Sequence, residues 1–318
     1  MAEKVLVTRE IPEAGLRLLE DFDVTVLFER PPERGELLEA VRGANGILPT
    51  VTEKMDAEVM DTAGEGLKVI ANMAVGYDNV NVEAARERDI VVTNTPEVLT
   101  ETTADTTFML LLAAARRLGE AERLLRSGKW DAWGPMQLLG PDVWGKKLGL
   151  VGLGRIGQAV ARRSSGFQME VLYYDQYRNE GVEEELGARY LELDDLLRES
   201  DFVSIHTPLT PETRHLISER ELDLMQPTSV LVNASRGPVV DEAALADALA
   251  ERRIFAAGLD VYEEEPKVHP KLLELENVVL APHIGSASIE TRDSMAALAA
   301  ENLVAVLRGE QPKTPVGE

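Results

Sequence analysis

The chain has 318 residues and a mass of 34.9 kDa, which favours about two domains over one small binding module. It carries 33 Lys and Arg against 56 Asp and Glu, a formal net charge of −23, and no basic stripe. Because phosphate contacts need clustered cations, we expect no nucleic-acid partner. The chain has no cysteine, which excludes disulfides, thiolate catalysis and thiolate metal sites, and we expect no bound metal.

The apolar runs are short. The longest, residues 108–115, is less than half a bilayer span, and the run near the N-terminus is too short for a signal peptide. We therefore expect a soluble, cytoplasmic protein without membrane association. The acidic excess is typical of the self-repelling surface of salt-adapted proteins, a hypothesis that loss of stability on adding salt would contradict.

The chain before Thr95 alternates strand-like and helix-like patterns. Amphipathic stretches near residues 12–20, 33–42 and 82–88 separate the apolar runs KVLVT, DVTVL, GILPT, LKVIANM and IVVTN. Near-continuous apolar strands that alternate with helices indicate a parallel sheet covered on both faces. The first part of the chain is therefore predicted to be one α/β unit.

The pattern breaks at Thr95-Pro96 and then resumes. A long helix is predicted from Thr100 to Arg117, followed by a second helix and a loop rich in Trp, Gly and Pro. Six further strand candidates come next: KLGLVGLG, EVLYYD, DFVSIHTP, SVLVNASRG, FAAGLDV and NVVLAPH. A final helix over residues 289–308 has no strand after it, so we expect it to pack back on the first lobe. The fold class is α/β, with two doubly wound parallel sheets.

One glycine motif has the context of a dinucleotide site. It follows the apolar run 148–151, opens a helical segment, and reads Gly152, Leu153, Gly154, Arg155, Ile156, Gly157. In the G-x-G-x-x-G pattern the first glycine makes a tight turn, the second admits the pyrophosphate and the third permits close packing of helix on strand. The pyrophosphate would lie at the helix N-terminus, where free N–H groups favour an anion.

The next strand ends in an acid that favours NAD. Asp175 stands where a carboxylate hydrogen-bonds the two ribose hydroxyls and repels a 2′-phosphate. Gln176 and Tyr177 supply no cation beside it, whereas Arg178 is close enough to keep NADP possible. We expect NADH as the preferred cofactor.

Three polar residues follow predicted strands where an α/β sheet binds its ligands: Arg236, Asp260 and His283. Each has an ordinary alternative, since His283 could be a capped loop histidine and Arg236 a surface ion pair. Glu265 could belong to a solvated acidic run. A Glu265–His283 pair would instead fix the imidazole tautomer and make the histidine a competent general acid. The planar fork of Arg236 suits a substrate carboxylate.

Several long motifs together resemble a known family. GLGRIG, NASRGPVVDEAAL, GLDVYEEEP and APHIGSAS are similar to the D-isomer-specific 2-hydroxyacid dehydrogenases, and NMAVGYDNVN with WDAWGP most resembles the glyoxylate/hydroxypyruvate reductase branch. The resemblance covers essentially the whole chain. It implies a flavodoxin-like substrate domain over residues 1–99 and 287–318, with a Rossmann NAD(P)-binding domain over 100–286 between its two parts.

The resemblance also implies a role for each matching residue. Arg236 would hold the substrate's carboxylate and carbonyl, His283 would protonate the C2 oxygen, and Glu265 would orient His283. Val75 and Gly76 would bind the substrate carboxylate through their backbone N–H groups. Trp133, or Trp130 in its place, would reach the partner's site in a homodimer. Beyond the glycine motif, the implied cofactor contacts are Asp175, Gln176, Tyr177, Thr103, Thr207, Pro208, Ala234, Ser235, Arg236, Asp260, His283, Ile284 and Gly285.

The expected activity is reduction of a small 2-oxoacid, glyoxylate or hydroxypyruvate, to the D-2-hydroxyacid with hydride from NADH. Glu265 stands where formate dehydrogenases have Gln, which disfavours formate, and little chain follows Arg308 to form a regulatory domain. Asp175 departs from the basic or hydroxylic residues of NADPH-preferring members. A D-3-phosphoglycerate or other D-2-hydroxyacid dehydrogenase is the alternative enzyme. An NAD-sensing, corepressor-like binding protein is the alternative of another class.

Overall fold

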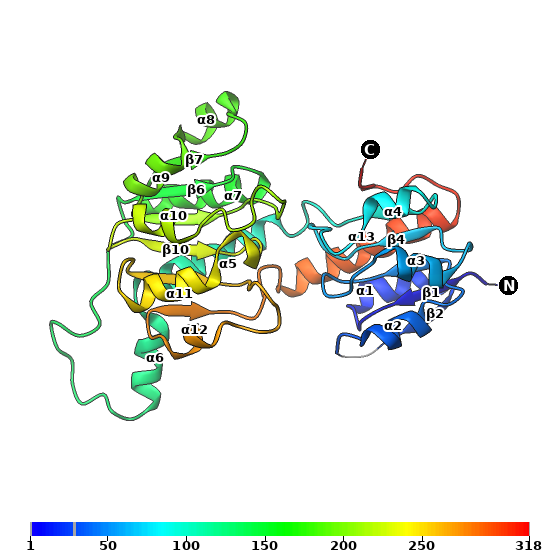
Figure 1. Ribbon diagram of the computed structural model, residues 1–318, viewed down its shortest axis with the longest axis horizontal. Coiled ribbons are helices and arrows are strands. Elements are labelled where there is room, and N and C mark those ends of the chain that lie inside the picture. The colour runs from blue at the N-terminus through cyan, green and yellow to red at the C-terminus, as the bar shows by residue number, and fades with distance from the viewer. Residues whose placement is uncertain (1, 28–29, 318) are drawn as a thin grey trace. The chain divides into compact units, whose positions relative to one another are not determined.

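The computed structural model describes residues 2–27 and 30–317, in two compact units (Figure 1). The first unit comprises Met1–Leu99 and Ser286–Glu318, and the second comprises Thr100–Gly285. Each unit is built around its own sheet and is described by itself.

The first unit is a five-stranded parallel sheet in the order β2-β1-β3-β4-β5, which is the flavodoxin-like order. Valine, leucine and isoleucine dominate the central strands, and both faces of those strands are buried. The register aligns Val5 with Gly46 and Val69 with Val91. The strands are β1 (Lys4–Val7), β2 (Asp23–Val26), β3 (Gly46–Leu48), β4 (Val69–Ala71) and β5 (Val91–Thr93).

The helices of the first unit pack on that sheet. The long C-terminal helix lies against β3 and β4 and crosses α1 at Gly15, where a Cβ atom would lie 2.7 Å from the Ala296 carbonyl oxygen. The Asp56 and Ser288 side chains accept N–H bonds at the starts of α3 and α13. The helices are α1 (Glu13–Leu16), the 3-10 turn η1 (Arg17–Leu19), α2 (Arg34–Ala40), α3 (Ala57–Ala63), α4 (Val82–Arg86) and α13 (Ile289–Leu307).

The second unit is a seven-stranded parallel sheet in the order β12-β11-β10-β9-β6-β7-β8. The chain starts in the centre at β6, builds outward through β7 and β8, and then returns to the other side at β9. This reversal is the switch point of a Rossmann fold, where ligands bind beyond the carboxyl ends of the strands. The strands are β6 (Lys147–Val151), β7 (Glu170–Tyr174), β8 (Arg189–Tyr190), β9 (Phe202–Ile205), β10 (Val230–Asn233), β11 (Ala256–Leu259) and β12 (Val278–Leu280).

Helices cover both faces of the second sheet. Gly258 of β11 lets α5 approach closely, because a Cβ atom there would lie 3.0 Å from Leu110 Cβ. The α-helices are α5 (Thr100–Ala115), α6 (Leu118–Arg126), α7 (Arg155–Ser164), α8 (Glu180–Leu186), α9 (Leu193–Glu199), α10 (Glu219–Leu224), α11 (Glu242–Ala250) and α12 (Pro270–Glu274). Two 3-10 turns are η2 (Ser165–Phe167) and η3 (Gly237–Val239).

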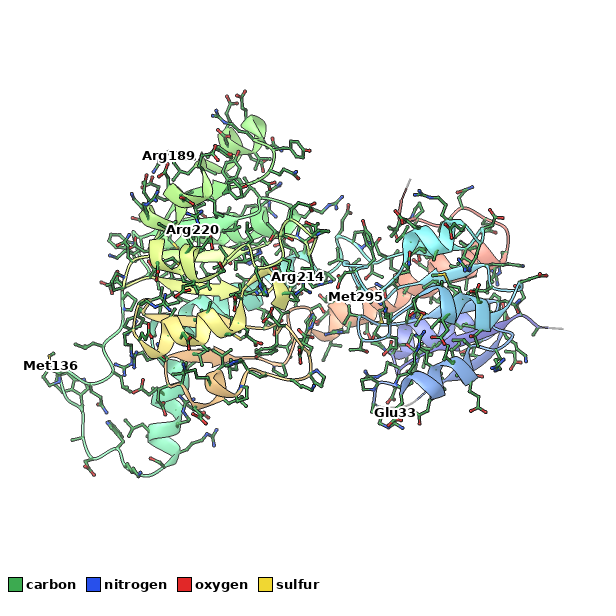
Figure 2. All side chains as sticks on the ribbon, in the orientation of Figure 1. Glu33, Met136, Arg189, Arg214, Arg220 and Met295 are labelled. Atoms are coloured by element: carbon green, nitrogen blue, oxygen red, sulfur yellow. The ribbon has the colours of Figure 1, made fainter. Side chains whose placement is uncertain are left out.

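Residues 127–145, here called the arm, follow α6 and contain no helix or strand. The arm loops out from the sheet of its unit, with Met136 near its far end (Figures 1 and 2). Five of its large apolar side chains are exposed: Trp130, Trp133, Met136, Leu139 and Trp144. Trp133 and Met136 are the most exposed, at 79% and 78%. Loops of this length without regular structure are uncommon in compact domains, and they are usually either functional or linkers.

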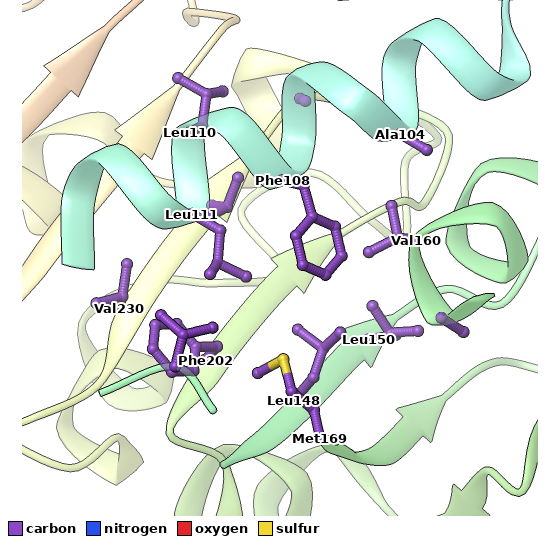
Figure 3. Packing of buried hydrophobic residues seen from close by; sticks show 14 of the residues in the cluster. Ala104, Phe108, Leu110, Leu111, Leu148, Leu150, Val160, Met169, Phe202 and Val230 are labelled. Atoms are coloured by element: carbon purple, nitrogen blue, oxygen red, sulfur yellow. The ribbon is translucent and has the colours of Figure 1, made fainter. Parts of the chain in front are cut away.

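The second unit has two buried clusters, and one of them lies between α5 and the central strands (Figure 3). Phe108 of α5 stacks on Phe167 with ring centroids 5.5 Å apart. It belongs to one buried cluster with Leu148 and Leu150 of β6 and Phe202 of β9. This packing fixes β6 and β9, whose ends carry the candidate site.

The predicted α/β class with two parallel sheets is confirmed. The predicted long helices run over Thr100–Ala115 and Ile289–Leu307, close to the expected bounds. The sequence analysis missed α3 and the two-residue strand β8, which is too short to show a period. In the described part of the chain, no helix is both long and apolar enough to span a membrane.

Candidate active site

The three glycines of the motif do different things at the β6–α7 turn. Gly152 has φ +98°, and a Cβ atom there would lie 2.9 Å from the His206 carbonyl carbon. A Cβ atom on Gly157 would lie 2.4 Å from the Gly152 oxygen, whereas one on Gly154 would meet nothing within 4 Å. The first and third glycines are thus required by the fold, and the second leaves open space. Gly154 begins α7 without a side-chain cap, so the N–H groups of its first turn are available to an anion.

The end of β9 faces the same turn. The Thr207 Oγ1 atom is buried and has no hydrogen-bond partner among the described residues. Beside it, burial lowers the pKa of His206 to about 4, and its Nε2 atom lies 2.8 Å from Ser204 Oγ. His206 is therefore neutral near pH 7 and is a poor proton donor, whereas Thr207 offers an orphaned hydroxyl to a ligand.

Asp175, directly after β7, is joined to the glycine turn. Its Oδ2 atom accepts a hydrogen bond from the Leu153 N–H group at 2.8 Å. This bond holds the carboxylate beside the turn and uses one of its two oxygens. Its Oδ1 atom remains to accept hydrogen bonds from a ligand's hydroxyl groups.

The cation near Asp175 is engaged elsewhere. Arg178 donates from Nε and Nη2 to the two carboxylate oxygens of Glu183 in α8, at 2.7 and 2.9 Å. Tyr173 also donates to Glu183, at 2.6 Å. The bonds from Arg178 and then Tyr173 lower the pKa of Glu183 to about 2, and the same ion pair raises the pKa of Arg178. A bidentate pair of this kind aims the guanidinium fork at Glu183.

Arg236 follows β10 and is positioned by its neighbours. Asn233 donates to the Arg236 carbonyl oxygen at 3.0 Å, and Arg236 Nη1 donates to the Ser235 carbonyl at 2.9 Å. Gly237 allows the next turn to press against the Tyr262–Glu263 peptide, because a Cβ atom there would lie 1.9 Å from the Tyr262 carbonyl. This close approach brings Arg236 near the segment after β11 that carries Glu263 and Glu265.

The Glu265–His283 pair is formed. The His283 Nδ1 atom lies 2.8 Å from Glu265 Oε2, and the Tyr262 N–H group donates to the other carboxylate oxygen at 3.1 Å. Burial raises the pKa of Glu265, but the hydrogen bond and charge of His283, the Tyr262 N–H group and the charge of Arg236 together hold that pKa below its usual value. Glu265 is thus ionised, binds Nδ1–H, and leaves Nε2 as the ring nitrogen for a ligand.

Asp260 braces the His283 loop. Its carboxylate oxygens each accept one backbone N–H bond, from Ile284 and Gly285, both at 2.7 Å. Burial raises the pKa of Asp260 against the effect of these two bonds. A Cβ atom on Gly285 would lie 3.0 Å from Asp260 Oδ2 and 3.5 Å from Thr103 Cγ2, so Thr103 of α5 lies at this loop.

The second unit thus gathers most of the predicted site residues at the carboxyl edge of its sheet. Ala234 and Ser235 follow β10, Pro208 follows Thr207, and the exposed Gln176 and Tyr177 follow Asp175. Arg155 and Ile156 occupy the first turn of α7. Val75 and Gly76 lie in the first unit, after β4. The sequence analysis did not predict the ion pair between Glu183 and Arg178. The one sequence signal for it was the short separation of five residues between the two opposite charges.

Comparisons with known proteins identify relatives over the whole chain. Residues 108–285 match the family model described as D-isomer specific 2-hydroxyacid dehydrogenase, NAD binding domain. A glyoxylate reductase of Thermococcus litoralis is 51% identical over 324 aligned positions, covering 100% of this chain and 98% of the relative.

Two solved structures extend the comparison. A Thermus thermophilus protein has a TM-score of 0.92 at 49% identity, covering 99% of this chain and 100% of that one. An NADPH-dependent glyoxylate/hydroxypyruvate reductase of Sinorhizobium meliloti, solved with NADP and malonate, has a TM-score of 0.89 at 38% identity, covering 100% and 97%.

The fold and these relatives define a nicotinamide-dependent oxidoreductase that acts on a CH–OH group. The chain belongs to the D-isomer-specific 2-hydroxyacid dehydrogenase family.

Proposed function

We propose that the protein reduces glyoxylate or hydroxypyruvate to the corresponding 2-hydroxyacid, with NADH as the preferred hydride donor. The observation that carries the proposal is the Glu265–His283 pair beside Arg236, at the same sheet edge as the glycine turn. The glyoxylate reductase of Thermococcus litoralis, 51% identical over the full chain, supports the substrate.

The residues present fit a dinucleotide. Gly154 leaves room for a pyrophosphate, the Thr207 hydroxyl lacks a partner, and Asp175 has an oxygen for ribose. The nicotinamide, when bound, supplies the hydride that C2 of the 2-oxoacid receives. Thr103, Ala234, Ser235, Asp260 and Gly285 would line the nicotinamide half, while Gln176, Tyr177 and Pro208 would border the adenosine half.

The chain's own residues orient the substrate and move the proton. Arg236 binds the carboxylate and the 2-oxo oxygen and offsets negative charge that develops on that oxygen. His283 donates its Nε2 proton to the oxygen, and Glu265 holds Nδ1–H so that the ring faces the substrate in one tautomer. Val75 and Gly76 bind the substrate carboxylate through their N–H groups. These roles make the chemistry a general-acid-assisted reduction.

Two features support NADH over NADPH. Asp175 places a negative charge where a 2′-phosphate would lie, which costs binding free energy. Arg178, the nearest cation along the chain, is held by Glu183. The Sinorhizobium meliloti relative is NADPH-dependent, so the preference is a property of these residues rather than of the fold.

The arm supports a homodimer. Trp133, Met136, Leu139 and Trp144 are each more than half exposed on a loop that leaves its own sheet. Exposed apolar surface of this kind marks protein–protein contact, and a second copy of this chain is the proposed partner. Trp133 is more exposed than Trp130, whose indole N–H donates to Gln137 at 3.2 Å, so Trp133 is the better candidate to reach the partner's site.

The test is a panel of turnover measurements. The purified protein is mixed with NADH or NADPH, and cofactor oxidation is followed with glyoxylate, hydroxypyruvate, pyruvate and phosphohydroxypyruvate. We expect the largest kcat/KM for glyoxylate or hydroxypyruvate with NADH. A preference for phosphohydroxypyruvate would indicate the phosphoglycerate alternative, and tight NADH binding without turnover on any acid would favour the sensing alternative.

A further inference from the structure

The loop after β4 in the first unit has a one-sided pattern of hydrogen bonds. Three successive carbonyl oxygens accept bonds from the chain: Ala74 from the Thr95 N–H, Val75 from Asn94 Nδ2, and Gly76 from Asn72 Nδ2, at 2.8, 2.8 and 2.9 Å. The N–H groups of Val75 and Gly76 donate to no described residue. Both residues are half-buried, so two adjacent donors remain without a protein acceptor.

The orientation of Asn72 is dictated by a second asparagine. Asn79 Nδ2 lies 2.9 and 3.0 Å from the carbonyl oxygens of Thr50 and Glu53, so that atom must be the nitrogen. Asn72 Oδ1 accepts from Asn79 Nδ2 at 3.1 Å, which leaves the Asn72 nitrogen to face Gly76. Asn72 is fully buried and cannot exchange this bond for water.

A buried carboxylate supports the asparagine pair. Glu53 is 3% exposed and accepts from Thr8 Oγ1 at 2.6 Å, from the Thr50 N–H at 2.8 Å, and from the hydroxyl of Thr52. These bonds fix the loop after β3, whose carbonyls hold Asn79. The network therefore joins the carboxyl ends of β1, β3, β4 and β5.

We propose that Asn94 and Asn72 are positioning residues, here called the tethers, that hold this loop so that the Val75 and Gly76 N–H groups face a carboxylate ligand. Asn94 binds the Val75 carbonyl, which lies in one peptide plane with the Gly76 N–H, and Asn72 binds the Gly76 carbonyl and so fixes the peptide on the other side of Gly76. The Val75 N–H lies in one plane with the Ala74 carbonyl, which the Thr95 N–H holds. The proposal rests on the carboxylate-binding role of Val75 and Gly76 given above. Adjacent backbone N–H groups that point the same way form an anion-binding concavity. The tethers use uncharged side chains, so they add no charge that would repel an anionic substrate. They turn the amides before the ligand arrives, which lowers the entropic cost of binding.

The test uses the full-length protein and the variants Asn94→Ala and Asn72→Ala. The Asn94 side chain donates only to Val75, so its removal leaves the rest of the network in place. One hydrogen bond contributes about 1 kcal/mol, so each variant should raise the KM for glyoxylate about fivefold to tenfold with kcat within about twofold. Oxamate, a carboxylate that is not reduced, should bind the enzyme–NADH complex more weakly by the same factor in calorimetry.

Asn45→Ala is the matched control, because Asn45 also donates to a loop carbonyl of this unit, that of Gly66, but at the opposite edge of the sheet. It should leave KM and oxamate affinity unchanged. Folding is checked by thermal melts, and Asn94→Ala is decisive if the buried Asn72→Ala fails to fold. A folded Asn94→Ala variant that binds oxamate like the wild type, or that loses kcat with KM unchanged, would overturn the proposal.

Failure of the proposed function has a different signature. A wild-type protein that binds oxamate but does not reduce glyoxylate would refute the substrate, and the tethers would still be tested by oxamate affinity. A wild-type protein that binds no oxamate would overturn the carboxylate site and the tethers together.

Discussion

The two units are both parallel α/β sheets, but the carboxyl edges of the two sheets carry different functional groups. In the first unit the edge carries asparagines and threonines bonded to one another around Glu53, and it presents bare backbone N–H groups. In the second unit the edge presents ionisable groups, above all Glu265 and His283. The first edge is suited to recognise a carboxylate by geometry, and the second to transfer a proton. The two strand orders differ, and in the proposed function only the second edge carries a charged ligand for the carboxylate, Arg236, together with the proton donor, His283.

The largest expected effect is at His283. Because the proposed role of His283 is to supply the proton, His283→Ala should lower kcat with glyoxylate about 100-fold or more while leaving the calorimetric Kd for NADH unchanged. His215→Ala is the control, since His215 also pairs with a glutamate, Glu263, at a partly exposed position. Wild-type turnover in His283→Ala would move the chemistry away from this edge and break the comparison.

The next effect is on cofactor choice. Asp175→Asn removes the charge but keeps an acceptor for the Leu153 N–H, so the ratio of kcat/KM for NADPH to that for NADH should rise about tenfold or more. An unchanged ratio would refute the role given to Asp175.

A smaller gain should come from releasing the cation. Glu183→Gln frees Arg178 to meet a 2′-phosphate, so kcat/KM for NADPH should rise about twofold to fivefold, on the scale of one exposed ion pair. Glu184→Gln, one residue along the same helix, is the control and should change nothing. Equal NADPH kinetics in the two variants would show that Glu183 does not restrain the arginine.

A further prediction concerns the arm, which lies outside both sheet edges. If a second copy covers it, sedimentation at micromolar concentration should give twice the chain's 34.9 kDa, and replacing Trp133 by Ala should shift the equilibrium toward the monomer. A monomer mass for the wild type would contradict the dimer.

The smallest effect concerns stability and pH. The pKa of Glu183 is about 2 against an ordinary value of 4.5, so its ion pair stabilises the fold above about pH 4.5 and loses that contribution as the pH falls toward 2. The melting temperature of Glu183→Gln should therefore lie slightly below that of the wild type at pH 7, and the gap should narrow below pH 4.5. A gap that widens on acidification would contradict the assigned direction.

How much could be predicted from the sequence depends on how local each signal is. The glycine motif and Asp175 follow apolar strands directly, so their place at the β6 and β7 ends was predictable. The pairing of Glu265 with His283 was inferred from two separate strand ends and is formed. The tethers of the first unit were not foreseen, because they join Thr50, Asn72 and Asn94 through contacts that exist only once the sheet is assembled.

All three tryptophans of the chain, Trp130, Trp133 and Trp144, lie in the arm, and all are exposed. The tryptophan fluorescence, excited selectively over the six tyrosines, is therefore a local probe of this one loop. If the arm moves from water into an apolar interface, the wavelength of maximum tryptophan emission should shift. Measuring that wavelength against protein concentration would therefore follow self-association without any label.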